Sequence, residues 1–212
     1  EEVSMMSDPT EVLLSINHRL RERAKEMPVS EQEAEELFST VGLVAVIDKG
    51  TRTLRFAGAG DCMLFVKRTD DSFVWRTVNI AERFEQAEIA AGKTVASERG
   101  VPLPDVFDDP KVDGKIRENR KCENASDGSG YAALKGGPDA VLTLYIQNGE
   151  MQLQPGDTVY LLTDGMLPPA EGLKEARHLA ESALRAGGIK RLLAMTYDVQ
   201  KQDVHCTKPR LK

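Results

Sequence analysis

An aspartate that directly follows a short apolar strand is the residue of this chain best suited to chemistry. The run from Thr158 to Leu162 is mostly apolar, which predicts a strand buried on both faces, and Thr163, Asp164 and Gly165 follow it. A carboxylate held at the end of a rigid strand is a good ligand for Mg²⁺ or Mn²⁺, because these ions need oxygen donors at defined geometry. The glycine would let the chain turn sharply there. The alternative is that Asp164 and Gly165 only make a turn.

A second aspartate is expected at the tip of a hairpin. The segment from Thr53 to Val66 contains two predicted strands, about 52–58 and 62–67, around a Gly-Ala-Gly-Asp turn that ends at Asp61. Upstream, Ser39 to Ile47 is predicted to be a buried strand. The expected order is therefore a buried strand, a hairpin that carries Asp61, a long middle region and a strand that ends at Asp164.

This order of motifs resembles the metal-dependent protein phosphatases of the two-C type. Members of that family carry a "GSTA"-like strand, then an "A-N-x-G-D-S-R" hairpin, then "G-D-x-x-L-L-x-S-D-G". The matching pieces here are Ser39-Thr40, the segment from Ala57 to Asp61, and the segment from Gly156 to Gly165. The last of these also looks like the sporulation-regulator branch of the same superfamily.

The resemblance implies a fold, an activity and a set of metal ligands. The fold would be α+β, with two stacked and mostly antiparallel sheets flanked by helices in an α-β-β-α sandwich. The activity would be hydrolysis of phosphoserine and phosphothreonine in a phosphoprotein by a dinuclear Mn²⁺ or Mg²⁺ centre. Asp164 would be a metal ligand with Gly165 beside it, and Asp61 would belong to a further, weaker cation site or be a structural acid.

The sequence departs from the family pattern at several places. It has no match to the early Asp-Gly pair, the early phosphate-binding Arg or the late Asp pair of the family, and Pro168 stands where an acid usually follows Asp164. We therefore expect residues 1–212 to be a single phosphatase-like domain that is incomplete at both ends and has little or no turnover. The alternatives are a catalytically inactive phosphatase-like binding or regulatory module, and a sandwich interaction domain in which the turn motifs are coincidental.

Composition limits the class of protein. The 212 residues are 41% hydrophobic and 29% charged, which is ordinary for a globular protein. The net charge of −6 argues against general nucleic-acid binding, because the phosphate backbone favours basic surfaces. The three cysteines, of which Cys206 follows His205, form no Cys-x-x-Cys pair, so we expect a reducing, cytoplasmic setting. The sequence shows neither an apolar run long enough to span a bilayer nor a signal peptide, and it leaves the oligomeric state open.

The remaining elements follow from capping and periodicity. The pattern predicts helices over Asp8–Met27, Ser30–Glu36, Ala81–Ala91 (capped by Gly92), Glu171–Ala186 (capped by Gly187-Gly188) and Ile189–Gln200, and strands over Phe73–Val78, Val141–Ile146 and Glu150–Leu153, the last two joined by an Asn148-Gly149 turn. Residues 93–138 lack periodicity, and the resemblance implies a flap-like insertion there. The paired acids Asp108 and Asp109 in this segment are expected to be exposed loop residues rather than metal ligands.

Overall fold

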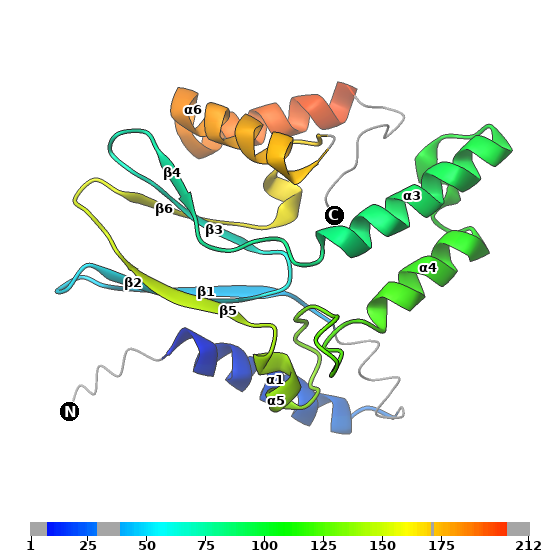
Figure 1. Ribbon diagram of the computed structural model, residues 1–212, viewed down its shortest axis with the longest axis horizontal. Coiled ribbons are helices and arrows are strands. Elements are labelled where there is room, and N and C mark those ends of the chain that lie inside the picture. The colour runs from blue at the N-terminus through cyan, green and yellow to red at the C-terminus, as the bar shows by residue number, and fades with distance from the viewer. Residues whose placement is uncertain (1–7, 29–38, 171, 203–212) are drawn as a thin grey trace. The chain divides into compact units, whose positions relative to one another are not determined.

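The structure is a computed structural model that describes residues 8–28, 39–170 and 172–202 (Figure 1). It divides into two compact units. The first unit spans Glu1–Ile80 and Cys122–Leu161, and the second spans Ala81–Lys121 and Leu162–Lys212. The chain belongs to the α+β class, with two small antiparallel sheets and separate helices. The prediction of one domain over 1–212 stays a prediction.

Both sheets belong to the first unit, except for Leu162 at the end of the last strand. In one, β2 (Thr53–Ala59) lies between β1 (Gly42–Asp48) and β5 (Gln147–Gln152) and is antiparallel to both. In the other, β3 (Met63–Lys67) lies between β4 (Phe73–Trp75) and β6 (Thr158–Leu162).

The inner faces of these sheets share one apolar core. Leu54 and Phe56 on β2 are buried together with Leu64 and Val66 on β3, and side chains from β1, β5 and β6 pack against them. Alternate residues of a strand point to the same face, so the two central strands each place two side chains in this layer. The prediction of two stacked sheets is therefore confirmed for the first unit.

The predicted hairpin around Asp61 is wrong. Strand β2 pairs with β1 and β5, whereas β3 pairs with β4, so the two strands on either side of Asp61 belong to different sheets. The chain crosses from one sheet to the other at Gly60, whose φ of 85° lies in the left-handed region. A Gly-rich turn between two strands is compatible with a hairpin and with a sheet-to-sheet crossing, and only the choice of partner strand separates them.

The predicted strand Val141–Ile146 and its Asn148-Gly149 turn are also wrong. Residues Asp139–Thr143 form a short helix, α5, and β5 runs straight through Asn148 and Gly149, which pair with Ala57 and Phe56 on β2. The glycine here serves close packing, since a Cβ on Gly149 would lie 3.0 Å from the Phe56 ring.

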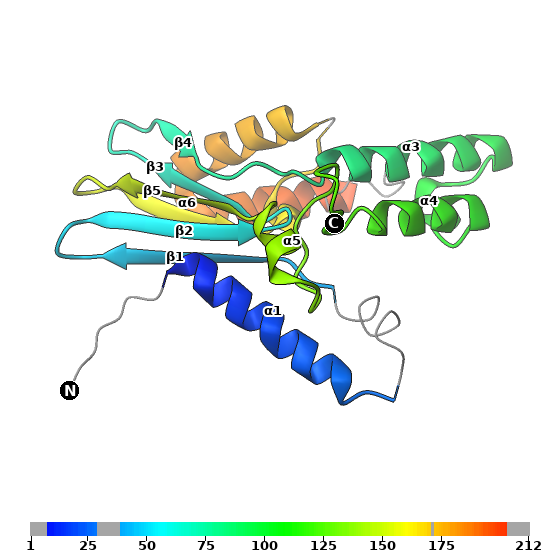
Figure 2. The same ribbon diagram turned by 60° about the horizontal axis from the view of Figure 1, so that its bottom comes forward.

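The N-terminal helix α1 (Pro9–Lys25) begins as predicted, because the Asp8 side chain accepts a hydrogen bond from the amide of Thr10 and Pro9 takes the first helical position. Its Leu13 joins a second core with Ala57 and Ala59, on the β2 side opposite the inter-sheet core (Figure 2). The first unit is thus a helix layer on two stacked sheets.

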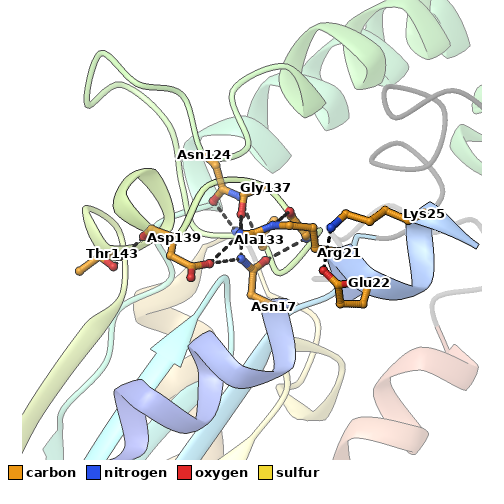
Figure 3. Close-up of polar contacts among 10 residues, drawn as sticks. Asn17, Arg21, Glu22, Lys25, Asn124, Ala133, Gly137, Asp139 and Thr143 are labelled. Atoms are coloured by element: carbon orange, nitrogen blue, oxygen red, sulfur yellow. Dashed lines mark hydrogen bonds and ion pairs between the residues drawn. The ribbon is translucent and has the colours of Figure 1, made fainter. Parts of the chain in front are cut away.

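A polar network attaches α1 to the loop before α5 (Figure 3). Asn17 is fully buried, and it donates to the carbonyl of Gly137 and to Asp139 while accepting from the amide of Gly136. Arg21 donates to the carbonyls of Gly136 and Gly137 and to Asp139. Arg21 therefore holds this loop in place.

We expect Asn17→Ala to destabilise the first unit by roughly 2–3 kcal/mol, because it leaves the Gly136 amide and the Gly137 carbonyl without the Asn17 side chain in a buried setting. The measurement is the free energy of unfolding in urea. Ser15→Ala, at an exposed position of the same helix, should stay within about 0.5 kcal/mol of the wild type. An equal loss in both variants would contradict a specific role for the network.

The second unit is helical. Helix α3 (Glu82–Arg99) packs against the 3₁₀ turn η1 (Leu103–Val106) and helix α4 (Pro110–Arg120) through a core that includes Val95, Val106 and Val112 (Figure 1). Helix α3 does not end at Gly92, as predicted, but at Gly100, which adopts the left-handed conformation. Gly92 lies inside the helix, where a Cβ would lie 2.8 Å from Cδ1 of Leu103, so the glycine permits close packing there.

The predicted flap over 93–138 is not one structural segment. Its first part forms the end of α3 together with η1 and α4, and its last part, from Cys122, belongs to the first unit. Asp108 is exposed as expected, but Asp109 is buried, caps α4 through the amide of Lys111 and pairs with Arg99. Asp109 is therefore a structural residue, which agrees with its exclusion as a metal ligand but not with its predicted exposure.

Helix α6 (Leu173–Gln202) is interrupted at Gly187 and Gly188, where the backbone is not helical. The two predicted helices and the Gly-Gly break between them are confirmed. The predicted helix Ser30–Glu36 lies outside the described residues. Of the helices that the structure describes, none combines the length and the apolar character needed to cross a membrane.

Candidate metal centre

Asp164 lies where the sequence predicts it, directly after the strand. Strand β6 ends at Leu162, and Asp164 opens a single 3₁₀ turn, η2 (Asp164–Met166), in which the Leu167 amide donates to the Asp164 carbonyl at 2.8 Å. The side chain of Thr196 on α6 donates to the Met166 carbonyl at 3.1 Å and so ties this turn to the helix. Asp164 is 6% exposed. The acid is therefore held by a strand on one side and by a helix contact on the other.

The strand before it is less enclosed than predicted. Leu161 on β6 is exposed, while Leu162 is buried, so β6 is not covered on both faces. β6 is an edge strand of its sheet, and an edge strand has only one neighbour to cover its flank.

Gly165 does not have the conformational role expected of it. It is absent from the positive-φ residues, and no described atom would lie within 4 Å of a Cβ placed on it. The turn could therefore hold another residue at this position. The open space leaves room for a ligand beside the Gly165 backbone.

A second acid of the same unit lies close to Asp164. Glu85, in the first turn of α3, is half-buried, and one of its carboxylate oxygens lies within 4.8 Å of an oxygen of Asp164. At metal–oxygen distances of about 2.0–2.6 Å, two oxygens at this separation can bind the same hard cation. Two carboxylates so close repel each other, and a divalent cation between them removes that repulsion.

Sequence reasoning did not single out Glu85. It predicts a helix over Ala81–Ala91, and the resembling family often carries a glutamate there. The predicted helix, however, contains Glu82, Glu85 and Glu88, and no spacing in the sequence selects one of them. Only the position of η2 relative to α3 within the second unit identifies the residue.

Asp61 belongs to the first unit, at the crossing from β2 to β3. Its side chain is half-buried, and among the described residues none donates a hydrogen bond to its Oδ1 atom. Burial raises the pKa of the Asp61 carboxyl, and a hydrogen bond from its own backbone amide works in the opposite direction. A carboxylate that is partly desolvated and incompletely hydrogen-bonded costs stability, which is typical of functional positions.

The raised pKa of Asp61 predicts how the free energy of unfolding depends on pH. Because the folded-state pKa of Asp61 is raised, the folded state binds the proton more tightly than the unfolded state, and the charged form weakens the fold above that pKa. We expect Asp61→Asn to raise the free energy of unfolding at pH 7 by roughly 1 kcal/mol. The gain should shrink on acidification and vanish below the unfolded pKa of about 3.9.

Urea unfolding at neutral and acidic pH measures this effect. Asp70→Asn is the matched control in the same unit, because hydrogen bonds from Ser72 lower the pKa of Asp70 and its charge is exposed. It should not stabilise the protein at pH 7. A loss of stability at pH 7 in the Asp61 variant would show that this carboxylate is a structural residue.

Of the described cysteines, neither belongs to the group of acids at this centre. Cys62 is buried and Cys122 is half-buried, and neither forms a disulfide with a described residue. His205 and Cys206 lie outside the described residues. Trp75 packs against the Phe65 ring, with ring centroids 4.2 Å apart. No protein-family model and no curated protein matches this chain.

Proposed function

We propose that this chain is a metal-dependent protein phosphatase domain of the two-C type, which hydrolyses phosphoserine and phosphothreonine with Mn²⁺ or Mg²⁺. The observation that carries the proposal is the buried acid Asp164 at the end of β6, with the Glu85 carboxylate within 4.8 Å in the same unit. The three motif pieces described above, in the order of that family, support the same assignment.

Asp164 and Glu85 would hold one divalent cation, with the Gly165 carbonyl as a further oxygen donor. Such an ion typically takes one or two carboxylates and completes its coordination with water and substrate phosphate. When bound, the cation supplies charge neutralisation for the phosphoryl oxygens and a water that ionises near neutral pH. The protein would keep the two carboxylates in place. Thr196 ties the turn η2, which carries Asp164, to α6, and the first turn of α3 carries Glu85.

Asp61 is assigned by its motif alone, as the acid of the "G-D-S-R"-like turn. In the proposed enzyme it belongs to a further cation, while its burial and raised pKa are the local properties that support a functional role. The same proposal includes four further properties. They are the α-β-β-α sandwich, a phosphoprotein substrate, the absence of nucleic-acid binding and a cytoplasmic location.

Hydrolysis of p-nitrophenyl phosphate by the full polypeptide that the gene encodes tests the proposal. We expect turnover that requires Mn²⁺ or Mg²⁺ and stops with a chelator. Isothermal titration with Mn²⁺ gives an independent reading on the chain of 212 residues. The proposal is rejected if the chain does not bind Mn²⁺ and the full polypeptide shows no turnover.

A second candidate is a phosphatase-like module that binds a partner without catalysis. The observation in its favour is Pro168, which is buried at the position where the resembling family has an acid after Asp164. A proline cannot ligate a cation through its side chain, so this position contributes no metal charge. Mn²⁺ binding without turnover by the full polypeptide would favour this candidate.

A further inference from the structure

The second half of α6, residues 189–202, carries an apolar stripe that is partly exposed. Helix α6 is labelled in Figure 1. Ile189, Leu193 and Tyr197 follow one another at intervals of four residues and are 38%, 47% and 65% exposed. Next to this stripe on the same helix, Leu192 and Thr196 are buried, and the Thr196 hydroxyl donates to the Met166 carbonyl of its own unit. An exposed apolar row at this spacing is the usual form of a helix that docks on another helix.

Cations border this stripe. Around a helix axis, Lys190 and Lys201 fall within about 40° of Tyr197, whereas Asp198 lies about 100° away. Within residues 189–202, all of which the structure describes, Lys190, Arg191 and Lys201 face solvent and Asp198 is the one acid. This part of the helix is basic in a chain whose net charge is −6.

We propose that the stripe of Ile189, Leu193 and Tyr197 docks an acidic amphipathic helix of a partner protein. The apolar side chains of the partner would cover the three residues, and its carboxylates would lie beside Lys190 and Lys201. Charges at contact act over less than the screening length of about 8–10 Å, so these cations outweigh the distant negative charge of the chain. The inference does not depend on the proposed phosphatase activity.

The charge of the stripe also favours an acidic partner helix over the other molecules or segments that could cover it. A second copy in a two-fold contact would bring the same lysines together, which opposes association. An anionic membrane is an extended surface and would meet the whole chain with its net charge of −6. The segment 203–212 carries Lys208, Arg210 and Lys212 against Asp203, so its charge has the same sign as that of the stripe.

Fluorescence anisotropy with two synthetic peptides tests the inference. Both peptides have about 15 residues, the length at which helices begin to persist, with three leucines at intervals of four. One carries glutamates beside the leucines and the other carries lysines. We expect the acidic peptide to bind, more weakly as salt increases, and Leu193→Ser/Tyr197→Ser to weaken binding at least about tenfold. Lys190→Glu/Lys201→Glu should reverse the preference toward the basic peptide.

Two matched controls exclude general effects. Leu144→Ser removes an even more exposed leucine in the first unit, and Lys174→Glu reverses one exposed lysine charge in the first half of α6. Both should bind the acidic peptide as the wild type does, and the melting temperatures of all variants should agree. The proposal is overturned if neither peptide binds or if the controls lose as much affinity as the stripe variants. It is also overturned if sedimentation or vesicle flotation shows self-association or lipid binding through the stripe instead.

Discussion

Replacing Asp164 with asparagine is expected to abolish the thermal stabilisation of this chain by Mn²⁺ and to lower the turnover of the full polypeptide at least about a hundredfold. Loss of an outer-shell partner of a metal ligand already costs 10–100-fold in affinity or activity, so loss of a ligand charge costs no less. The asparagine has nearly the same volume, and Asp164 is buried, so the substitution changes charge rather than packing.

Differential scanning fluorimetry with and without Mn²⁺ measures this directly. A ligand at 100 times its dissociation constant stabilises a protein by about 2.7 kcal/mol, which is a shift of several degrees. The wild type should gain this shift, whereas Asp164→Asn and Glu85→Gln should lose it. Asp105→Asn, an exposed acid of the same unit, is the matched control and should keep the wild-type shift.

The melting temperatures of the metal-free proteins are the second measurement. If the acid pair is a cation site, neutralising one carboxylate relieves repulsion, and the metal-free variant should melt no lower than the wild type. A metal-free variant that melts many degrees lower would indicate a structural acid. A Mn²⁺ shift that persists in both substituted proteins would place the cation elsewhere.

Gly60→Ala should be strongly disruptive to the first unit, with a loss of roughly 3 kcal/mol in the free energy of unfolding. Two causes add up. A residue with a Cβ pays about 1–2 kcal/mol in the left-handed conformation that Gly60 adopts. The new Cβ would also lie 2.1 Å from Cγ1 of Val41, and such overpacking costs about 1–3 kcal/mol.

Gly128→Ala separates the two causes, because Gly128 has nearly the same positive φ and no atom within 4 Å of an added Cβ. Urea unfolding should give a loss of about 1–2 kcal/mol there, from backbone strain alone. Val41→Ala in the Gly60→Ala background should recover part of the difference, since it removes the Cγ1 atom that overlaps most. Equal losses at both glycines would show that the crossing has room for a side chain.

The crossing at Gly60 also explains what could be predicted about Asp61. The motif placed this acid in a tight Gly-rich turn, and the structure has it there. The sequence pattern also predicts that the two strands beside the turn pair with each other. In the structure, β2 pairs with β1 and β5, and β3 pairs with β4 and β6. A residue just after a sheet-to-sheet crossing is held by both sheets, which gives a firmer base for a functional acid than the tip of a free hairpin.

Local signals alone determined the elements whose cause lies within a few residues. The Asp8-Pro9 cap defines the start of α1, the apolar run Thr158–Leu162 coincides with β6, and Gly187-Gly188 interrupts α6. Capping and backbone preference act over one helical turn, so these features can be seen in the sequence without knowledge of the fold.

Tertiary structure alone decided the pairings and the neighbours of the acids. Strand β5 pairs with β2 about ninety positions earlier in the chain. Asp109 is buried and pairs with Arg99, and Glu85 is set apart from Glu82 and Glu88 by its distance to Asp164. Such contacts depend on which surfaces meet after chain folding, and sheet pairing in particular is governed by packing rather than by intrinsic preference. The sequence thus identified the acid at the end of β6, and the fold of the second unit supplied its neighbour.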